Sequence, residues 1–149
     1  MKIVDTFAFL VGTWRVMRAI EDHRTGTRGW FEGVAALTEV PSDRRGALGA
    51  RARYDEVGEL HFGTHIGQAR RNLQYARMGD ATVMLYFTDG RPFVDLDLAP
   101  GEWHSTHFCG DDRYDIATFV RTRSVVEERW RVTGPATGYE AITTLTRVD

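Results

Sequence analysis

The sequence of 149 residues fits one domain over residues 1–149, and a domain of this length buries roughly two-thirds of the surface that its unfolded chain exposes. Its 19 basic and 21 acidic residues are spread along the chain and give a net charge of −2. A basic stripe of the kind that neutralises phosphates is lacking, which disfavours nucleic acid as a partner.

No apolar run reaches the roughly 18 residues that indicate a membrane span. Asp5 interrupts the first residues at the place where a signal peptide needs an apolar stretch. We therefore expect a cytoplasmic protein that binds neither nucleic acid nor a membrane.

A short helix is predicted over Asp5–Gly12, with Asp5 or Thr6 as N-cap and Gly12 as its end. From Thr13 onward the pattern changes to alternation with a period of two, rich in aromatic and β-branched residues and broken by turn residues. This pattern predicts about eleven short strands, namely Thr13–Asp22, Arg28–Val40, Leu48–Asp55, Leu60–Ile66, Ala69–Met78, Thr82–Thr88, Phe93–Leu98, Glu102–Phe108, Tyr114–Thr122, Val125–Thr133 and Tyr139–Val148.

The predicted strands are separated by short turns. Asp89-Gly90 is the strongest hairpin pattern, Pro41-Ser42-Asp43 is a turn cluster, and Val57-Gly58 and Gly67 also read as breaks. A flat meander of so many strands would leave exposed edges, and closure into a barrel removes them. We therefore expect an all-β, antiparallel up-and-down barrel of about ten strands, with room for side chains or one small ligand.

The segment Phe9-Leu10-Val11-Gly12-Thr13-Trp14 resembles the Gly-X-Trp signature that opens the first strand of lipocalins, fatty-acid-binding proteins and other calycins. A glycine lets the entry helix turn into the strand, and the tryptophan then plugs the closed end of the barrel. The resemblance implies a lipocalin-like barrel with a short N-terminal helix.

Further motifs follow in order: Gly-Thr-Trp-Arg-Val, Asp-Gly-Arg-Pro-Phe with Asp-Leu-Asp-Leu, His-X-Cys-Gly-X-Asp-X-Tyr and Trp-Arg-Val-Thr-Gly-Pro. Together they resemble a bacterial family of single-domain, lipocalin-like proteins of unknown function, over nearly the whole chain. A histidine often stands in that family where this chain has Val94. The resemblance implies the fold and supplies no activity.

One predicted strand carries the first candidates for chemistry. Alternation puts Trp103 and His107 on one face and His104 on the other. Because the tryptophan is a natural inward anchor, His107 should face the lumen. There it can act as a general acid or base, with Asp95 of the preceding strand as its partner. A buried histidine that a neighbour simply satisfies fits the pattern equally well.

Two arginines are also expected to point inward, since Arg18 shares a face with Trp14, and Arg71 shares one with Leu73. Fatty-acid-binding barrels hold a carboxylate with lumenal Arg and Tyr, and an arginine fork suits that geometry. Ordinary Arg–Glu pairs on the sheet surface are the alternative. The predicted catalytic residues are His107, Asp95 and Tyr114, and the predicted substrate-binding residues are Arg18, Arg71, Tyr54, Tyr75, Trp103 and Asp112.

We expect neither a metal nor a cofactor. Zinc needs three or four convergent ligands, whereas His104 and His107 fall on opposite faces and the single Cys109 excludes a disulfide and an all-thiolate site. A glycine-rich phosphate loop and a nucleophile elbow are both missing from the sequence.

These residues support three hypotheses. In the first, the lumen binds a small anionic or carbonyl-containing metabolite, and His107 moves a proton in a cofactor-free isomerisation, cyclisation or lyase-type step. In the second, the same pocket belongs to a non-catalytic binding or carrier protein. In the third, apolar side chains fill the lumen and the protein is purely structural. Under the first two hypotheses the partner is a small molecule. The sequence leaves open whether the protein forms a homodimer.

Overall fold

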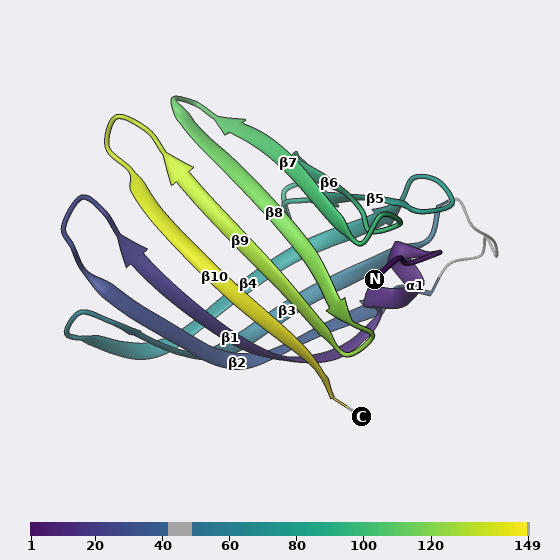
Figure 1. Ribbon diagram of the computed structural model, residues 1–149, viewed down its shortest axis with the longest axis horizontal. Coiled ribbons are helices and arrows are strands. Elements are labelled where there is room, and N and C mark those ends of the chain that lie inside the picture. Colours follow the sequence, from purple (N-terminus) through teal and green to yellow (C-terminus); the bar gives the residue numbers. More distant parts are fainter. Residues whose placement is uncertain (42–48, 149) are drawn as a thin grey trace.

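The computed structural model describes residues 1–41 and 49–148, and these form a nearly closed β-barrel with one short helix (Figure 1). The helix is α1 (Thr6–Leu10), and the strands are β1 (Gly12–Asp22), β2 (Arg28–Glu39), β3 (Arg51–Phe62), β4 (His65–Arg77), β5 (Thr82–Tyr86), β6 (Pro92–Asp97), β7 (Glu102–Cys109), β8 (Asp112–Thr122), β9 (Val125–Thr133) and β10 (Gly138–Val148). Ser42, Asp43 and Leu48, predicted in a turn and at a strand start, lie outside the described residues.

The strands form an antiparallel meander in the order β6-β5-β4-β3-β2-β1-β10-β9-β8-β7. β1 also pairs with β10, from Thr13 opposite Val148 to Asp22 opposite Tyr139, which brings the two ends of the chain together. β6 and β7 are the sheet's two end strands and lie in contact without a backbone ladder between them in the described ranges. We call this junction the seam. The predicted all-β, up-and-down barrel is confirmed.

Strand alternation separates a core face from a solvent face. In β1, Trp14 and Val16 are 2% and 0% exposed, whereas the alternate residues Arg15 and Met17 are exposed. The same period of two continues around the barrel. The position of a residue along its strand therefore decides whether its side chain meets the lumen or the solvent.

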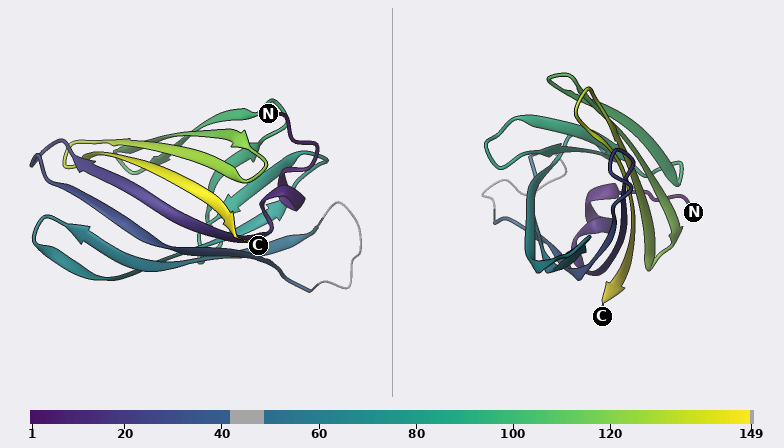
Figure 2. Two further views of the ribbon diagram at one scale, coloured as in Figure 1. Left: turned by 60° about the horizontal axis from the view of Figure 1, so that its bottom comes forward. Right: turned by 90° about the vertical axis from the view of Figure 1, so that its left-hand side faces the viewer.

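The helix α1 plugs one end of the barrel (Figure 2, right). Asp5 caps it by accepting a hydrogen bond from the Ala8 backbone N–H at 3.0 Å. The Trp14 indole donates to the Leu10 carbonyl at 2.8 Å, and the Thr6 hydroxyl accepts from the Leu98 N–H at 2.9 Å. The short helix is confirmed, although it ends at Leu10 and Gly12 already begins β1. The closing role predicted for the tryptophan is confirmed as well, because its indole is bonded to the helix at this end of the barrel.

The strand count differs from the prediction, because ten strands take the place of eleven. Val57-Gly58 does not end a strand: β3 continues to Phe62, and the chain turns only at Gly63, whose φ is +61°. Gly58 lies opposite Gly33 in β2, and a Cβ on it would collide with the Glu32 carbonyl and the Phe31 ring. Glycine therefore permits close packing inside the strand here and does not interrupt it.

β4 begins earlier than predicted, at His65 instead of Ala69, and includes Gly67. No helix in the described residues is long and apolar enough to span a membrane.

Candidate functional site

Polar side chains gather inside the barrel. They come from the inward positions of β1, β3, β4, β9 and β10 and comprise Arg18, Tyr54, Glu56, Arg71, Tyr75, Glu128, Trp130, Tyr139 and Thr143. Alternation brings them together, because each shares a face with core residues of its own strand. We call this set the inner cluster.

Glu56 lies at the centre of the inner cluster and is 2% exposed. Arg18 donates to it twice, from Nη1 to Oε2 at 2.9 Å and from Nη2 to Oε1 at 2.8 Å. The remaining guanidinium nitrogen of Arg18, Nε, donates to Thr143 Oγ1 at 2.8 Å. The Tyr54 hydroxyl donates to Glu56 Oε1 at 2.8 Å. Each of the three guanidinium nitrogens of Arg18 thus donates within the protein, and two of them hold the Glu56 carboxylate in place.

Burial by itself would raise the pKa of Glu56, because a buried charge is poorly solvated. The hydrogen bonds from Arg18 and the charge of Arg71 outweigh burial, and the pKa of Glu56 lies below its ordinary value of 4.5. Burial raises the pKa of Tyr54 and of Tyr75 well above the usual range for tyrosine. At neutral pH the cluster therefore holds a carboxylate next to two neutral phenols.

Arg71 is less completely paired than Arg18. Its Nη2 lies 3.6 Å from Glu56 Oε1 and 3.9 Å from Glu128 Oε1, which is beyond hydrogen-bonding distance. Its guanidinium lies over the Trp130 ring, 4.8 Å from the centroid. The Arg71 Nε is buried and has no hydrogen-bond partner in the part of the chain that the structure describes. This nitrogen is enclosed by protein atoms, which leaves no room beside it for a further acceptor.

A cavity of about 210 Å³ adjoins Arg71. Its lining consists mainly of aromatic and apolar side chains, with Arg71 as the charged member: Arg71, Asn72, Leu73, Phe87, Phe93, Cys109, Tyr114, Trp130 and Tyr139. The Phe93 ring centroid lies 5.4 Å from that of Trp130 and 6.0 Å from that of Tyr114. Such tilted and edge-on contacts hold aromatic rings in fixed orientations. The wall is a pre-formed apolar surface beside a single charged donor.

His107 lies beside this cavity on the inward face of β7. Its ring centroid is 5.1 Å from Phe93 and 5.9 Å from Tyr114, whereas the His104 side chain on the outer face is 68% exposed. Burial, and then the neighbouring Cys109 and Asp112, raise the pKa of Tyr114. The tyrosine hydroxyl thus keeps its proton at neutral pH next to the imidazole.

Asp95 and Trp103 meet at the seam. Asp95 accepts a hydrogen bond from the Ser105 hydroxyl at 2.6 Å and another from the Trp103 indole at 3.3 Å. Both bonds join β6 to β7 where the backbone ladder is missing. Between Asp95 and His107 the structure shows no hydrogen bond in its described ranges, so the carboxylate holds the barrel wall and does not orient the imidazole.

Cys109 and Asp112 lie at the rim of the barrel, where they pair across the turn between β7 and β8. Cys109 is exposed and lines the cavity. The Asp112 carboxylate packs against Gly134, where an added Cβ would collide with it, and it is not part of the cavity lining. Within the described residues, no group of three or more His, Cys, Asp or Glu side chains is arranged to hold a metal ion.

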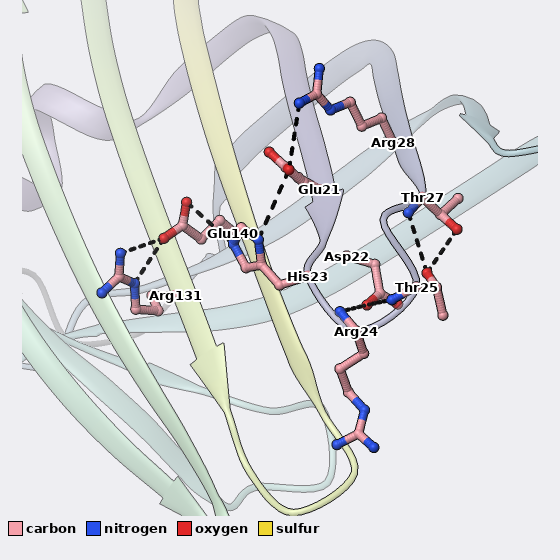
Figure 3. A network of polar contacts seen from close by, with 9 residues as sticks. All are labelled: Glu21, Asp22, His23, Arg24, Thr25, Thr27, Arg28, Arg131 and Glu140. Carbon is pink, nitrogen blue, oxygen red and sulfur yellow. Dashed lines mark hydrogen bonds and ion pairs between the residues drawn. The ribbon is translucent and has the colours of Figure 1, made fainter.

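A second charged group lies on the outer surface near the turn between β1 and β2 (Figure 3). His23 lies 3.6 Å from Glu140 and 4.0 Å from Glu21, and Arg131 donates to Glu140 at 2.5 Å. Arg28 approaches Glu21 at 3.6 Å. These side chains are solvated, with Arg131 66% exposed. Arg131 and Glu140 also border an open groove of about 560 Å³.

Sequence reasoning missed Glu56 and Glu128, the two carboxylates of the inner cluster. A usable signal was present: Glu56 shares a strand face with Tyr54, and Glu128 shares one with Val126 and Trp130. Glu56 escaped notice because the predicted strand ended before it. Cross-strand partners such as the Arg18–Glu56 pair depend on sheet order, which a local pattern does not contain.

Comparison with protein-family models places residues 10–147 in a family of unknown function, DUF6314. The chain belongs to this family. No curated protein matches it. Among solved structures, it is similar to the S-type phycobiliprotein lyase CPES from Guillardia theta, at 12% identity and a TM-score of 0.72, covering 100% of this chain and 94% of that one. A de novo designed fluorescence-activating β-barrel matches at 14% identity and a TM-score of 0.50, covering 98% of this chain and 100% of the designed one. At these identities the likeness shows the fold alone.

Proposed function

We propose that this barrel binds a small organic molecule in the cavity beside Arg71. The observation that carries the proposal is the cavity of about 210 Å³, which aromatic side chains line together with one charged residue, Arg71. An arginine guanidinium carries five N–H donors in a planar fork. A carbonyl or carboxylate of a bound ligand would accept a hydrogen bond from it.

The rest of the wall supports the same proposal. Phe93, Trp130 and Tyr114 present ring faces and edges that are fixed by mutual contact. Small-molecule sites typically combine such apolar walls with a few polar groups that set orientation. Arg18 contributes indirectly, because its fork holds Glu56 and is not available to a ligand.

The test uses Prodan, a neutral naphthalene ketone whose fluorescence responds to an apolar environment. Arg71→Met removes the lumenal donor, and Arg70→Met is its control because Arg70 is the neighbouring residue on the outer face of the same strand. We expect saturable binding to the parent and to Arg70→Met, and roughly tenfold weaker binding to Arg71→Met because a hydrogen bond to a charged group is lost. Absence of saturable binding to the parent, or equal binding to both variants, would contradict the proposal.

A second candidate function is cofactor-free acid–base catalysis of the isomerase or cyclase type. The specific observation in its favour is the position of His107, whose ring contacts Phe93 and Tyr114 at the edge of the cavity. An imidazole beside an aromatic cavity is a suitable general base, because its ordinary pKa lies near neutrality. The alternative is a carrier that uses the same cavity without chemistry.

Kemp elimination of nitrobenzisoxazole separates the two, because it reports a base in an apolar pocket without a cofactor. Catalysis requires that His107→Ala abolish the elimination while His104→Ala, on the outer face of the same strand, leaves it unchanged. A carrier predicts no elimination above buffer in any of the three proteins. Elimination that survives in His107→Ala would remove the histidine from the role of base.

Three expectations from the sequence stay predictions: bacterial origin, cytoplasmic location and a homodimer. Light scattering coupled to size-exclusion chromatography tests the last, with a mass of twice the chain as the expected result for a dimer.

A further inference from the structure

An apolar patch lies on the outer face of four neighbouring strands, β10, β1, β2 and β3 (Figure 1). Its large apolar side chains are each 41% to 46% exposed, namely those of Met17, Trp30, Val34, Val57 and Ile142. The small Ala19 joins them, since it lies directly opposite Trp30 on one side and Ile142 on the other. We call this set the outer patch. Monomeric proteins rarely expose so many large apolar side chains on one face, and such a face marks an interaction surface.

The centre of the outer patch is a recess between two large side chains. Ile142, Ala19 and Trp30 are successive neighbours across β10, β1 and β2, and the middle position carries only a methyl group. The Trp30 ring stacks on His61 of β3, with the centroids 3.9 Å apart and the planes 13° apart. Because the stack holds the ring in one orientation, little side-chain freedom remains to be lost when Trp30 binds a partner.

Charged residues of both signs surround the outer patch. Glu21 and Arg28 are direct neighbours on β1 and β2 and lie 3.6 Å apart, and the Arg28 side chain is 80% exposed. Arg15 and Glu32 border Met17 on the same face, and neither has an ion-pair partner within the described residues. A face with one sign of charge would favour nucleic acid or an anionic membrane, whereas a face with both signs can complement a copy of itself.

The order of these residues makes the face complementary to itself. In two successive rows, a residue of β1 and its neighbour in β2 have opposite properties: Ala19 is small and Trp30 is large, and Glu21 is acidic and Arg28 is basic. A two-fold axis that runs between β1 and β2, parallel to them, sets β1 of one copy against β2 of the other. Each Trp30 then lies over Ala19 of the second copy, and each Arg28 lies against Glu21 of the second copy.

The face also has the extent that a dimer needs. With strands about 4.8 Å apart and a rise of about 3.4 Å per residue, it measures roughly 19 Å by 27 Å, or about 500 Å² on each copy. Two copies would bury about 1,000 Å², which meets the lower limit for a specific interface. In the same arrangement Ile142 meets His61 of the second copy, and Arg15 lies diagonally across from Glu32 of the second copy.

We propose that the outer patch is the interface of a homodimer, with a two-fold axis between β1 and β2 and with each Trp30 seated over Ala19 of the second copy. The two sheets pack face to face, about 10 Å apart and with their strands within about 30° of each other. An aromatic side chain that fills a recess at the centre of an interface contributes much of the binding energy. The lumen lies on the opposite face of these strands, so the dimer does not depend on the binding proposed there.

Sedimentation velocity over a range of concentrations tests the assembly. We expect the parent to approach twice the chain mass of 16.9 kDa as its concentration rises. Trp30→Ala should weaken dimerisation roughly thirtyfold, because each dimer loses its two central aromatic side chains. Phe108→Ala is the control, since Phe108 is an exposed aromatic residue on the outer face of β7, outside the patch. It should leave dimerisation unchanged.

An exchange of large and small side chains tests the two-fold arrangement itself. Ala19→Trp sets two large side chains against each other in both contacts, and Trp30→Ala sets two small ones against each other. Each variant alone should therefore be largely monomeric. An equal mixture restores one large and one small side chain in each contact, and the two variants differ in mass. Native mass spectrometry of the mixture should then show a heterodimer.

A parent that stays monomeric at every concentration would overturn the proposal and leave the outer patch to a different partner. Equal dimerisation of the parent and Trp30→Ala would place the interface elsewhere, which overturns it as well. Two monomeric variants that are folded by circular dichroism and form no heterodimer would contradict the axis between β1 and β2.

Discussion

Two Arg–Glu pairs of this barrel share their chemistry and differ in their surroundings. Arg18 and Glu56 lie 2.8 Å apart inside the barrel, with side chains 11% and 2% exposed. Arg131 and Glu140 lie 2.5 Å apart on the outer surface, with side chains 66% and 34% exposed (Figure 3). Both link different strands of the same sheet. The two pairs differ in the face of the sheet on which they lie. A shift of one residue along a strand moves a side chain from one face to the other.

That difference changes what each pair does. Water and salt screen the outer pair, which can therefore form and break at little cost. The inner pair is largely shielded from solvent, so removing one member leaves a buried charge without its partner. The inner pair is thus part of the architecture of the lumen, and the outer pair is a feature of the surface.

Glu56→Gln should have the largest effect on stability. It leaves the Arg18 guanidinium without its counter-charge, and breaking a buried pair costs about 3–5 kcal/mol. Urea unfolding followed by circular dichroism measures the loss of unfolding free energy.

Glu59→Gln is the control for that measurement, because Glu59 lies on the outer face of the same strand and its side chain is 50% exposed. Its effect should stay within about 0.5 kcal/mol. Equal losses from the two variants would show that the inner pair has no special role in stability.

Lowering the pH should reduce the unfolding free energy of the parent more than that of Glu56→Gln. The pKa of Glu56 is lowered in the folded protein from an ordinary value of 4.5, so its contribution to stability is complete above that value and is lost as the pH falls through the folded pKa. The difference in unfolding free energy between parent and variant should therefore be constant near neutrality and shrink below an ordinary carboxyl pKa of 4.5. A difference that stays the same down to strong acid would contradict the ion pair in the folded state.

The smallest effect is expected for the outer pair. A double-mutant cycle with Arg131→Met and Glu140→Gln should give a coupling energy of about 0.2–1 kcal/mol at low ionic strength. At about 1 M salt the coupling should vanish, because the Debye length falls to about 3 Å. A coupling of several kcal/mol that persists in salt would show that the outer pair behaves like the inner one.

Strand alternation predicted much of this arrangement. Grouping Arg18 with Trp14 placed the arginine inside, and grouping His107 with Trp103 placed the histidine beside the cavity. The pattern did not identify Glu56 as the counter-charge, since Gly58 was taken as a break. In the structure that glycine is required by its packing against Gly33 and the Phe31 ring.

The role of Asp95 was also beyond local reasoning. Its hydrogen bonds to Ser105 and Trp103 matter because β6 and β7 are the two ends of the sheet. Which strands end a sheet depends on pairing between β1 and β10, far apart in sequence. Two residues predicted in the site thus have roles in the barrel wall that only the closed topology assigns.

Occupation of the lumen by a flat ligand beside Arg71 and Trp130 can be observed residue by residue. A ¹H–¹⁵N NMR titration of the parent with Prodan does so, with the Trp130 indole signal assigned through Trp130→Phe. We expect the Trp130 N–H to shift in a saturable manner, whereas the N–H of Trp30, which stacks on His61 at 3.9 Å on the outer face, should not move. A shift confined to Trp30, or none at either indole, would contradict binding in the lumen.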